Sequence, residues 1–116
     1  MRGINSLFLL GTLRGEPEQL TSKAGKNYIR FEMYVRTVRK TNGMDEEVSE
    51  IVPIVAFGKL GEIASKYVAP KDPLHVVAHI SSNEFRTDTG VSRRSISVVA
   101  DSVQMLPNGR KEDRAS

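Results

Sequence analysis

The sequence predicts an all-β domain in which five strands close into a barrel, with one α-helix between the third and fourth strands. Two observations carry this prediction. Alternating apolar and polar residues recur between turn signals along most of the chain, and only one segment has the spacing of an amphipathic helix. At 116 residues the chain has the length of a single domain. A sheet of this size leaves the fewest exposed edges by closing on itself.

The first three strands are expected at residues 6–13, 28–39 and 48–57. The second alternates most cleanly, with apolar residues at odd positions from Ile29 to Val35 and polar or amphipathic residues between them. Gly11 interrupts the first strand and suggests a bulge or a sharp bend there. Pro53 cannot donate a ladder hydrogen bond, so the third strand is expected to have an edge or a bulge at that point.

Turn signals separate these strands. Residues 15–27 form a turn-rich connection, and Thr41-Asn42-Gly43 is a tight turn. The acidic run at 45–47, together with Glu50, is expected to lie on a solvated loop. A divalent-cation site is the alternative interpretation of that run, but no nucleophilic or basic group accompanies it.

The helix is expected at 59–68, where one face collects apolar side chains at helical spacing: Leu60, Ile63, Ala64 and Tyr67. Pro70 ends it. The last two strands are expected at 74–82 and 94–106, joined by a hairpin tip at 87–90. Three strands, a helix and two strands are the arrangement of the OB fold, a five-stranded Greek-key barrel. We therefore expect one domain over residues 1–106 and a short disordered tail at 107–116.

Composition excludes several classes of protein. There is no cysteine, hence no disulfide framework or thiolate metal site, and no apolar run long enough for a membrane span or a secretory signal. A cytoplasmic protein is expected, with the matrix of an organelle as the alternative. His75 and His79 are four positions apart on a strand, about 13 Å, which is too far to share one ion. No nucleophile motif or phosphate-binding loop is present, so we expect no enzyme, no catalytic residues, no metal and no cofactor.

Binding of a single nucleic-acid strand requires cations along the phosphates and flat side chains against the bases. The net charge of +3 is compatible with such a partner without demonstrating it. The second strand and its exit loop interleave Arg30, Arg36, Arg39 and Lys40, interpreted as on or beyond the polar face, with Tyr28 and Tyr34. Phe85, between Glu84 and Arg86 near a hairpin tip, has little core to enter.

A family resemblance makes this hypothesis more specific. The segment 54–68, with Phe57-Gly58-Lys59-Leu60-Gly61-Glu62, closely resembles the strand-to-helix junction of bacterial-type single-stranded DNA-binding proteins. Weaker similarity covers residues 4 to 106, in the following segments: Asn5 to Gly11, Pro17-Glu18, Gly25-Lys26, Phe31, Phe85, the turn at 87–90 and Val103 to Leu106. The resemblance implies an OB-fold homotetramer that binds single strands without sequence preference, in DNA replication, recombination and repair.

The resemblance also implies four base-stacking positions, which fall on Arg39, Ile51, Phe57 and Phe85. Two of these are not aromatic. An arginine can stack through its guanidinium plane, whereas Ile51 cannot. The residues expected to contact DNA are Arg30, Tyr34, Arg36, Arg39, Lys40, Ile51, Phe57, Lys59, Phe85, Arg86, Arg93 and Arg94.

The C-terminus departs from that family, which typically ends in an acidic arm closing in Pro-Phe. This chain ends in a short, slightly basic segment, 110–116. Together with Arg36-Thr37-Val38 and Val52-Pro53-Ile54-Val55, that ending is similar to primosomal replication protein N, a dimeric relative. The alternative function is thus an OB-fold adaptor acting mainly through protein contacts in replication restart. Dimer or tetramer, DNA or RNA, and a chromosomal or mobile-element origin all stay open at this point.

Overall fold

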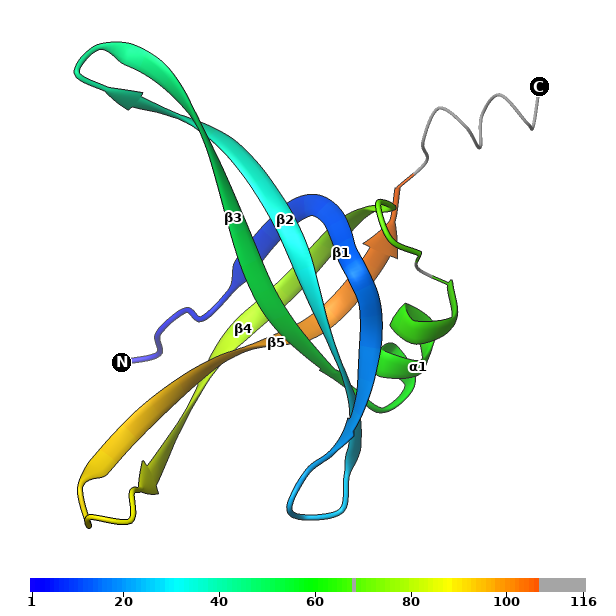
Figure 1. Cartoon of the computed structure of the whole chain (residues 1–116), viewed down its shortest axis with the longest axis vertical. Helices are drawn as coiled ribbons and strands as arrows, with labels where there is room; N and C mark the ends of the chain where they lie inside the picture. Colours follow the sequence, from blue (N-terminus) through cyan, green and yellow to red (C-terminus); the bar gives the residue numbers. More distant parts are fainter. Residues whose placement is uncertain (68, 107–116) are drawn as a thin grey trace.

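The computed structural model describes residues 1–67 and 69–106. Within them the chain forms five strands and one helix in the predicted order (Figure 1). These elements are β1 (Leu7–Thr21), β2 (Asn27–Thr41), β3 (Met44–Phe57), α1 (Gly58–Tyr67), β4 (Pro73–Arg86) and β5 (Ser92–Met105). The predicted tail, residues 107–116, lies outside the described residues.

The strands close into a barrel in the order β1-β2-β3-β5-β4. All pairs are antiparallel except β3 with β5, which meet in parallel at Val55 and Val99 and close the barrel. The interior holds one apolar cluster from every strand and the helix: Leu13, Ile29, Phe31, Met33, Ile54, Ala56, Ala64, Leu74, Val76, Ala78 and Ala100. The predicted five-stranded OB architecture is confirmed.

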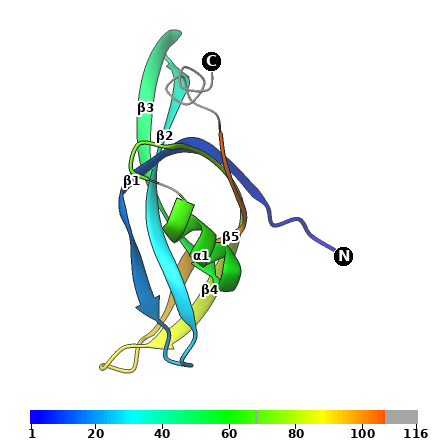
Figure 2. The ribbon, with the colours of Figure 1, turned by 90° about the vertical axis from the view of Figure 1, so that its right-hand side faces the viewer.

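Helix α1 lies across one opening of the barrel, where it contacts β1, β2, β3 and β5 (Figure 2). Ala64 is its buried side chain, but Ile63, expected on the same face, is 46% exposed. The expectation for Ile63 is wrong because Gly61 faces the barrel: a Cβ at Gly61 would lie 2.6 Å from the Ala56 carbonyl oxygen. The missing side chain lets the helix backbone approach the barrel directly, and this rotates Ile63 outward.

Gly11 is not a bulge. Its stretch of β1 pairs with β4 without interruption, from Leu7 with Ala78 to Thr12 with Pro73. A Cβ on Gly11 would lie 2.0 Å from the Tyr34 carbonyl oxygen, so glycine is needed where β1 and β2 approach each other. The irregularity in β1 falls between Arg14 and Glu18 instead, where Gly15 adopts a φ of 70°.

The strands are longer than predicted. The turn-rich connection expected at 15–27 is wrong for its first part, because β1 continues to Thr21 and pairs there with β2. In addition, two hairpins extend beyond the barrel. Residues 35–41 of β2 pair only with β3, and Ile80 onward in β4 pairs only with β5. We call the first the β2–β3 arm and the second the β4–β5 arm. The acidic run at 45–47, expected on a loop, lies on β3 within the β2–β3 arm. Pro53 lies in register opposite Glu32 without a bulge, on a stretch of β3 whose other edge is unpaired.

Candidate nucleic-acid interface

The register of β2 against β3 decides which side chains share a face. Asn42 and Gly43 have φ values of 54° and 79°, which suit a two-residue hairpin turn, and the pairing runs unbroken from Thr41–Met44 to Tyr28–Phe57. Ile29, Phe31 and Met33 point into the core. The residues between them therefore form an outer face, which we call the outer ladder: Tyr28, Arg30, Glu32, Tyr34, Arg36, Val38 and Lys40 on β2, with Phe57, Val55, Pro53, Ile51, Ser49, Glu47 and Asp45 opposite them on β3.

An aromatic pair stands at the barrel end of the outer ladder. The rings of Tyr28 and Phe57 have centroids 5.3 Å apart and are tilted by 35°. Phe57 is 43% exposed although it closes a strand whose neighbours, Ile54 and Ala56, are fully buried. An exposed ring on a barrel surface is available for stacking against a base.

Tyr34 and Ile51 lie directly opposite each other further along the outer ladder. Arg14 of β1 joins them. Its Nε donates a hydrogen bond to the Tyr34 hydroxyl at 3.1 Å, and its guanidinium carbon lies 5.7 Å from the ring centroid. The bond to Tyr34, and after it the bond to the Glu32 carboxylate, raises the pKa of Arg14 above its ordinary value. Arg14 was absent from the predicted set because only the β1–β2 register brings it here.

The cations of the β2–β3 hairpin are less concentrated than the sequence suggested. Arg39 lies opposite Glu46, on the reverse of the outer ladder, so its assignment to the polar face is wrong. Strand alternation is the reason, since adjacent residues point to opposite faces. Arg30 is 3.5 Å from Glu32, and Arg36 is 3.9 Å from Glu47. Residues 27–57 carry four Arg and Lys against five Asp and Glu, a net charge of −1.

The β4–β5 arm divides its predicted residues in the same way. Phe85 is 49% exposed and lies opposite Arg93, so these two share one face. Arg86 and Arg94 lie on the other face, where Arg94 is 3.7 Å from Glu84. The predicted contact set contains all three arginines, but the structure brings only Arg93 to the face that carries Phe85.

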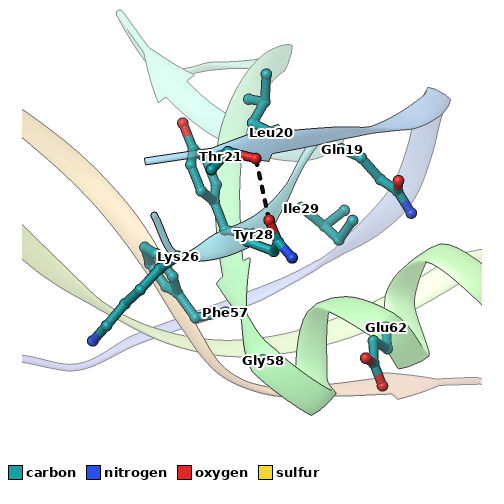
Figure 3. Close-up of a pocket in the computed structure, with 10 residues that line it drawn as sticks. Gln19, Leu20, Thr21, Lys26, Tyr28, Ile29, Phe57, Gly58 and Glu62 are labelled. Atoms are coloured by element: carbon teal, nitrogen blue, oxygen red, sulfur yellow. Dashed lines mark hydrogen bonds between the residues drawn. The ribbon is translucent and has the colours of Figure 1, made fainter. Parts of the chain in front are cut away.

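Lys59 is exposed in the first turn of α1, next to a pocket of about 810 Å³. The pocket lies between the β1–β2 turn, the end of β3 and the helix (Figure 3). It is lined by Gln19, Leu20, Thr21, Lys26, Asn27, Tyr28, Ile29, Phe57, Gly58 and Glu62. Lys26 and Tyr28 thus accompany Phe57, although neither was in the predicted set. The β1–β2 turn and the β4–β5 arm project from the same end of the barrel, and the β2–β3 arm projects from the opposite end (Figures 1 and 2).

The two histidines lie on β4 as expected. The Nδ1 atom of His79 is 2.9 Å from a carboxylate oxygen of Asp101 on β5. Among residues 1–67 and 69–106, no group of three or more His, Asp and Glu side chains is placed to hold a metal ion. Over the same part of the chain, no helix has the length and apolarity to cross a membrane.

Comparison with known proteins yields one family. The model of the "Single-strand binding protein family" matches residues 4–106. A "Single-stranded DNA-binding protein" of Xanthomonas axonopodis pv. citri is 34% identical over 112 residues, which span 96% of this chain but 62% of the relative. A protein of the same description from Xylella fastidiosa is 32% identical and covered over 68% of its length. The chain thus spans about two thirds of the curated relatives that it matches.

Solved structures agree on the fold. The wild-type single-stranded DNA-binding protein of Thermus aquaticus superposes with a TM-score of 0.78 at 19% identity, covering 95% of this chain and 53% of that one. The "SSB complex with ssDNA" of Plasmodium falciparum superposes with a TM-score of 0.73 at 14% identity, covering 92% and 98%.

Proposed function

The chain belongs to the single-strand binding protein family, and from that membership we propose that it binds single-stranded DNA without sequence preference and without a catalytic step. The observation that carries the proposal is the exposure of Phe57 and Phe85, whose large aromatic side chains are 43% and 49% exposed to solvent. Each has a cation nearby: Lys59 follows Phe57 closely in the chain, and Arg93 lies opposite Phe85. Rings for bases and cations for phosphates are what a single strand requires.

The contact residues that we propose keep the predicted set, with an order of importance drawn from geometry. Phe57, Phe85, Arg93 and Lys59 rank first, because each is exposed and has a ring or a cation of the complementary kind nearby. Arg30 ranks after them, because it lies 3.5 Å from the Glu32 carboxylate. Arg36 and Lys40 rank next in importance; they lie on the outer ladder, farther from the barrel than Tyr34 and Ile51. Arg39, Arg86 and Arg94 lie on reverse faces, so a strand reaches them only by passing around an edge of an arm.

The test compares oligo-dT with a duplex of equal length by fluorescence anisotropy over a salt series. We expect binding to oligo-dT that weakens steeply with salt, because phosphate contacts release counterions, and little binding to the duplex, whose bases are already stacked. Oligo-U of the same length measures the preference for DNA over RNA. Equal affinity for single strand and duplex, or no binding at low salt, would remove the proposal.

We also propose that the protein self-associates, as a homotetramer. Phe8 and Leu10 are 72% and 59% exposed on the outside of β1, a concentration of apolar surface that a monomer leaves in water. Residues 7–10 of β1 pair only with β4, so one edge of this segment is also unpaired. Light scattering should give about four times the 12.9 kDa chain mass, and a Phe8→Ser, Leu10→Ser variant should give less. A monomer at micromolar concentration would contradict self-association, and a dimer would contradict the tetramer alone.

In the cell we propose a cytoplasmic protein acting in DNA replication, recombination and repair. This role follows from the proposed binding, because each of those processes exposes single strands.

A further inference from the structure

The pocket beside Phe57 is built on an aromatic floor that the predicted contact set did not include. Tyr28 and Phe57 lie directly opposite each other on β2 and β3, and their rings touch at a centroid separation of 5.3 Å. A base inserted between two rings needs about 7 Å, twice an ordinary stacking distance. The rings therefore offer one two-ring surface, against which a base stacks from outside.

The β1–β2 turn forms a rigid wall of this pocket. The Ser22 amide donates to the Lys26 carbonyl at 2.8 Å, the Gly25 amide to the Ser22 carbonyl at 2.9 Å, and the Lys26 amide to the Ser22 hydroxyl at 3.1 Å. Gly25 supplies the left-handed conformation of the turn, with a φ of 83°. These bonds fix the backbone of Lys26 at the pocket, so a phosphate contact by its side chain carries no further ordering cost for the backbone.

The opposite wall is the first part of α1. Gly58 has a φ of 62°, and Gly61 brings the helix against the barrel. Among the described residues that line the pocket, Glu62 alone carries a carboxylate. In Figure 3, Lys26 extends past Phe57 on one side and Glu62 lies on the other side of Gly58. The pocket therefore has a cationic side and an anionic side, and a phosphate is favoured only at the first.

From this geometry we infer that the pocket holds one nucleotide of a bound strand, with its base stacked on the Tyr28–Phe57 surface and its phosphate at Lys26. The inference rests on the proposed function and adds to it a defined site with two new contact residues. The volume of about 810 Å³ lies within the range of small-molecule pockets. The β1–β2 turn, which lines the pocket, projects from the same end of the barrel as the β4–β5 arm (Figure 1), so a strand in the pocket can continue toward Phe85.

The test for the floor is the Tyr28→Leu variant, with Tyr28→Phe as the matched control, measured against oligo-dT of about 16 nucleotides. Loss of one stacking surface should weaken binding on the order of 5- to 100-fold. Tyr28→Phe keeps the ring and should bind as the wild type does. Wild-type affinity in Tyr28→Leu would overturn the pocket while leaving the proposed function in place. No binding by the wild type would instead remove the proposed function.

The test for the phosphate contact compares two lysines of the same turn. Lys26→Gln should reduce the slope of log affinity against log salt by about 0.7, the value for one phosphate on a single strand. Lys23→Gln, whose side chain does not line the pocket, should leave the slope unchanged. Equal changes in both variants would show general attraction by the turn and overturn the assignment of Lys26.

A measurement on the wild-type protein covers the case in which Tyr28→Leu fails to fold. Oligo-dT carrying 5-iodouracil should photocrosslink to Tyr28 or Phe57, as mapped by mass spectrometry of the digested complex. Crosslinks at Phe85 without any at Tyr28 or Phe57 would place the strand elsewhere and overturn the inference.

Discussion

The two arms of this barrel have similar architecture and different surface chemistry. Each is a two-stranded extension with both faces in solvent. The β2–β3 arm, residues 35–50, carries a net charge of −1, and its Arg36 lies 3.9 Å from the Glu47 carboxylate. The tip of the β4–β5 arm, residues 83–94, carries a net charge of +1 and holds the exposed Phe85 directly opposite Arg93.

The difference shows that the number of cations along a strand is a poor measure of a nucleic-acid surface. Four Arg and Lys residues lie on β2, yet alternation places Arg39 on the reverse face. The other three have carboxylates beside them: Glu32 on the same strand, and Glu47 and Asp45 on β3. Exposed ion pairs of this kind contribute little to stability, but they offset the charge that a phosphate would meet. An uncompensated arginine beside an open ring is the more effective contact, so the β4–β5 arm is expected to dominate binding.

The largest expected effect is that of Phe85→Ala. Removing the ring should weaken binding to oligo-dT by about 1–3 kcal/mol, the value of one stacked base. Ile96→Ala is the matched control, because Ile96 is 67% exposed on the same arm but lies opposite Ser82, on the other face. Anisotropy titrations of both variants make the comparison. Similar losses in the two variants would mean that exposed apolar surface, rather than stacking at Phe85, governs binding.

A smaller gain is expected from placing an aromatic ring at Ile51, an implied stacking position that is not aromatic. Ile51 is 47% exposed and lies opposite Tyr34, so Ile51→Trp places an indole on the outer ladder without entering the core. Binding to oligo-dT should tighten by about 1 kcal/mol. Thr37→Trp, on the reverse face of the same arm, should bind as the wild type does. An unchanged affinity in Ile51→Trp would show that the strand does not pass over this part of the outer ladder.

Much of the fold could be predicted from sequence because its signals are local. Alternation between Ile29 and Val35, the Asn42-Gly43 turn and the single helical stretch fix the order of elements without tertiary information. The length of the arms could not be found in this way. Beyond the barrel both faces of a hairpin are solvated, so Val38 and Met44 can be apolar and exposed at 67% and 73%, and alternation no longer reports burial.

Part of the candidate site could have been predicted from the sequence. Counting outward from the two-residue turn at Asn42-Gly43 pairs Tyr28 with Phe57 and Arg39 with Glu46. This count would have added Tyr28 to the predicted set and moved Arg39 to the reverse face. Lys26 and Arg14 were not predictable in the same way. Their positions depend on the β1–β2 register, which shifts between Arg14 and Glu18, and on the close passage of β1 over β2 at Gly11.

The smallest expected effect separates two neighbouring arginines. Arg93 shares its face with Phe85, whereas Arg94 lies on the reverse face, 3.7 Å from Glu84 and with a hydrogen bond to the Ser82 hydroxyl at 3.3 Å. Arg93→Gln should reduce the slope of log affinity against log salt by about 0.7, because one phosphate contact is lost. Arg94→Gln should change it less, since the Glu84 carboxylate already accompanies that charge. Both slopes are measured in the same anisotropy series. Equal changes in the two variants would mean that the DNA strand contacts both faces of the arm, and would contradict the different roles of Arg93 and Arg94.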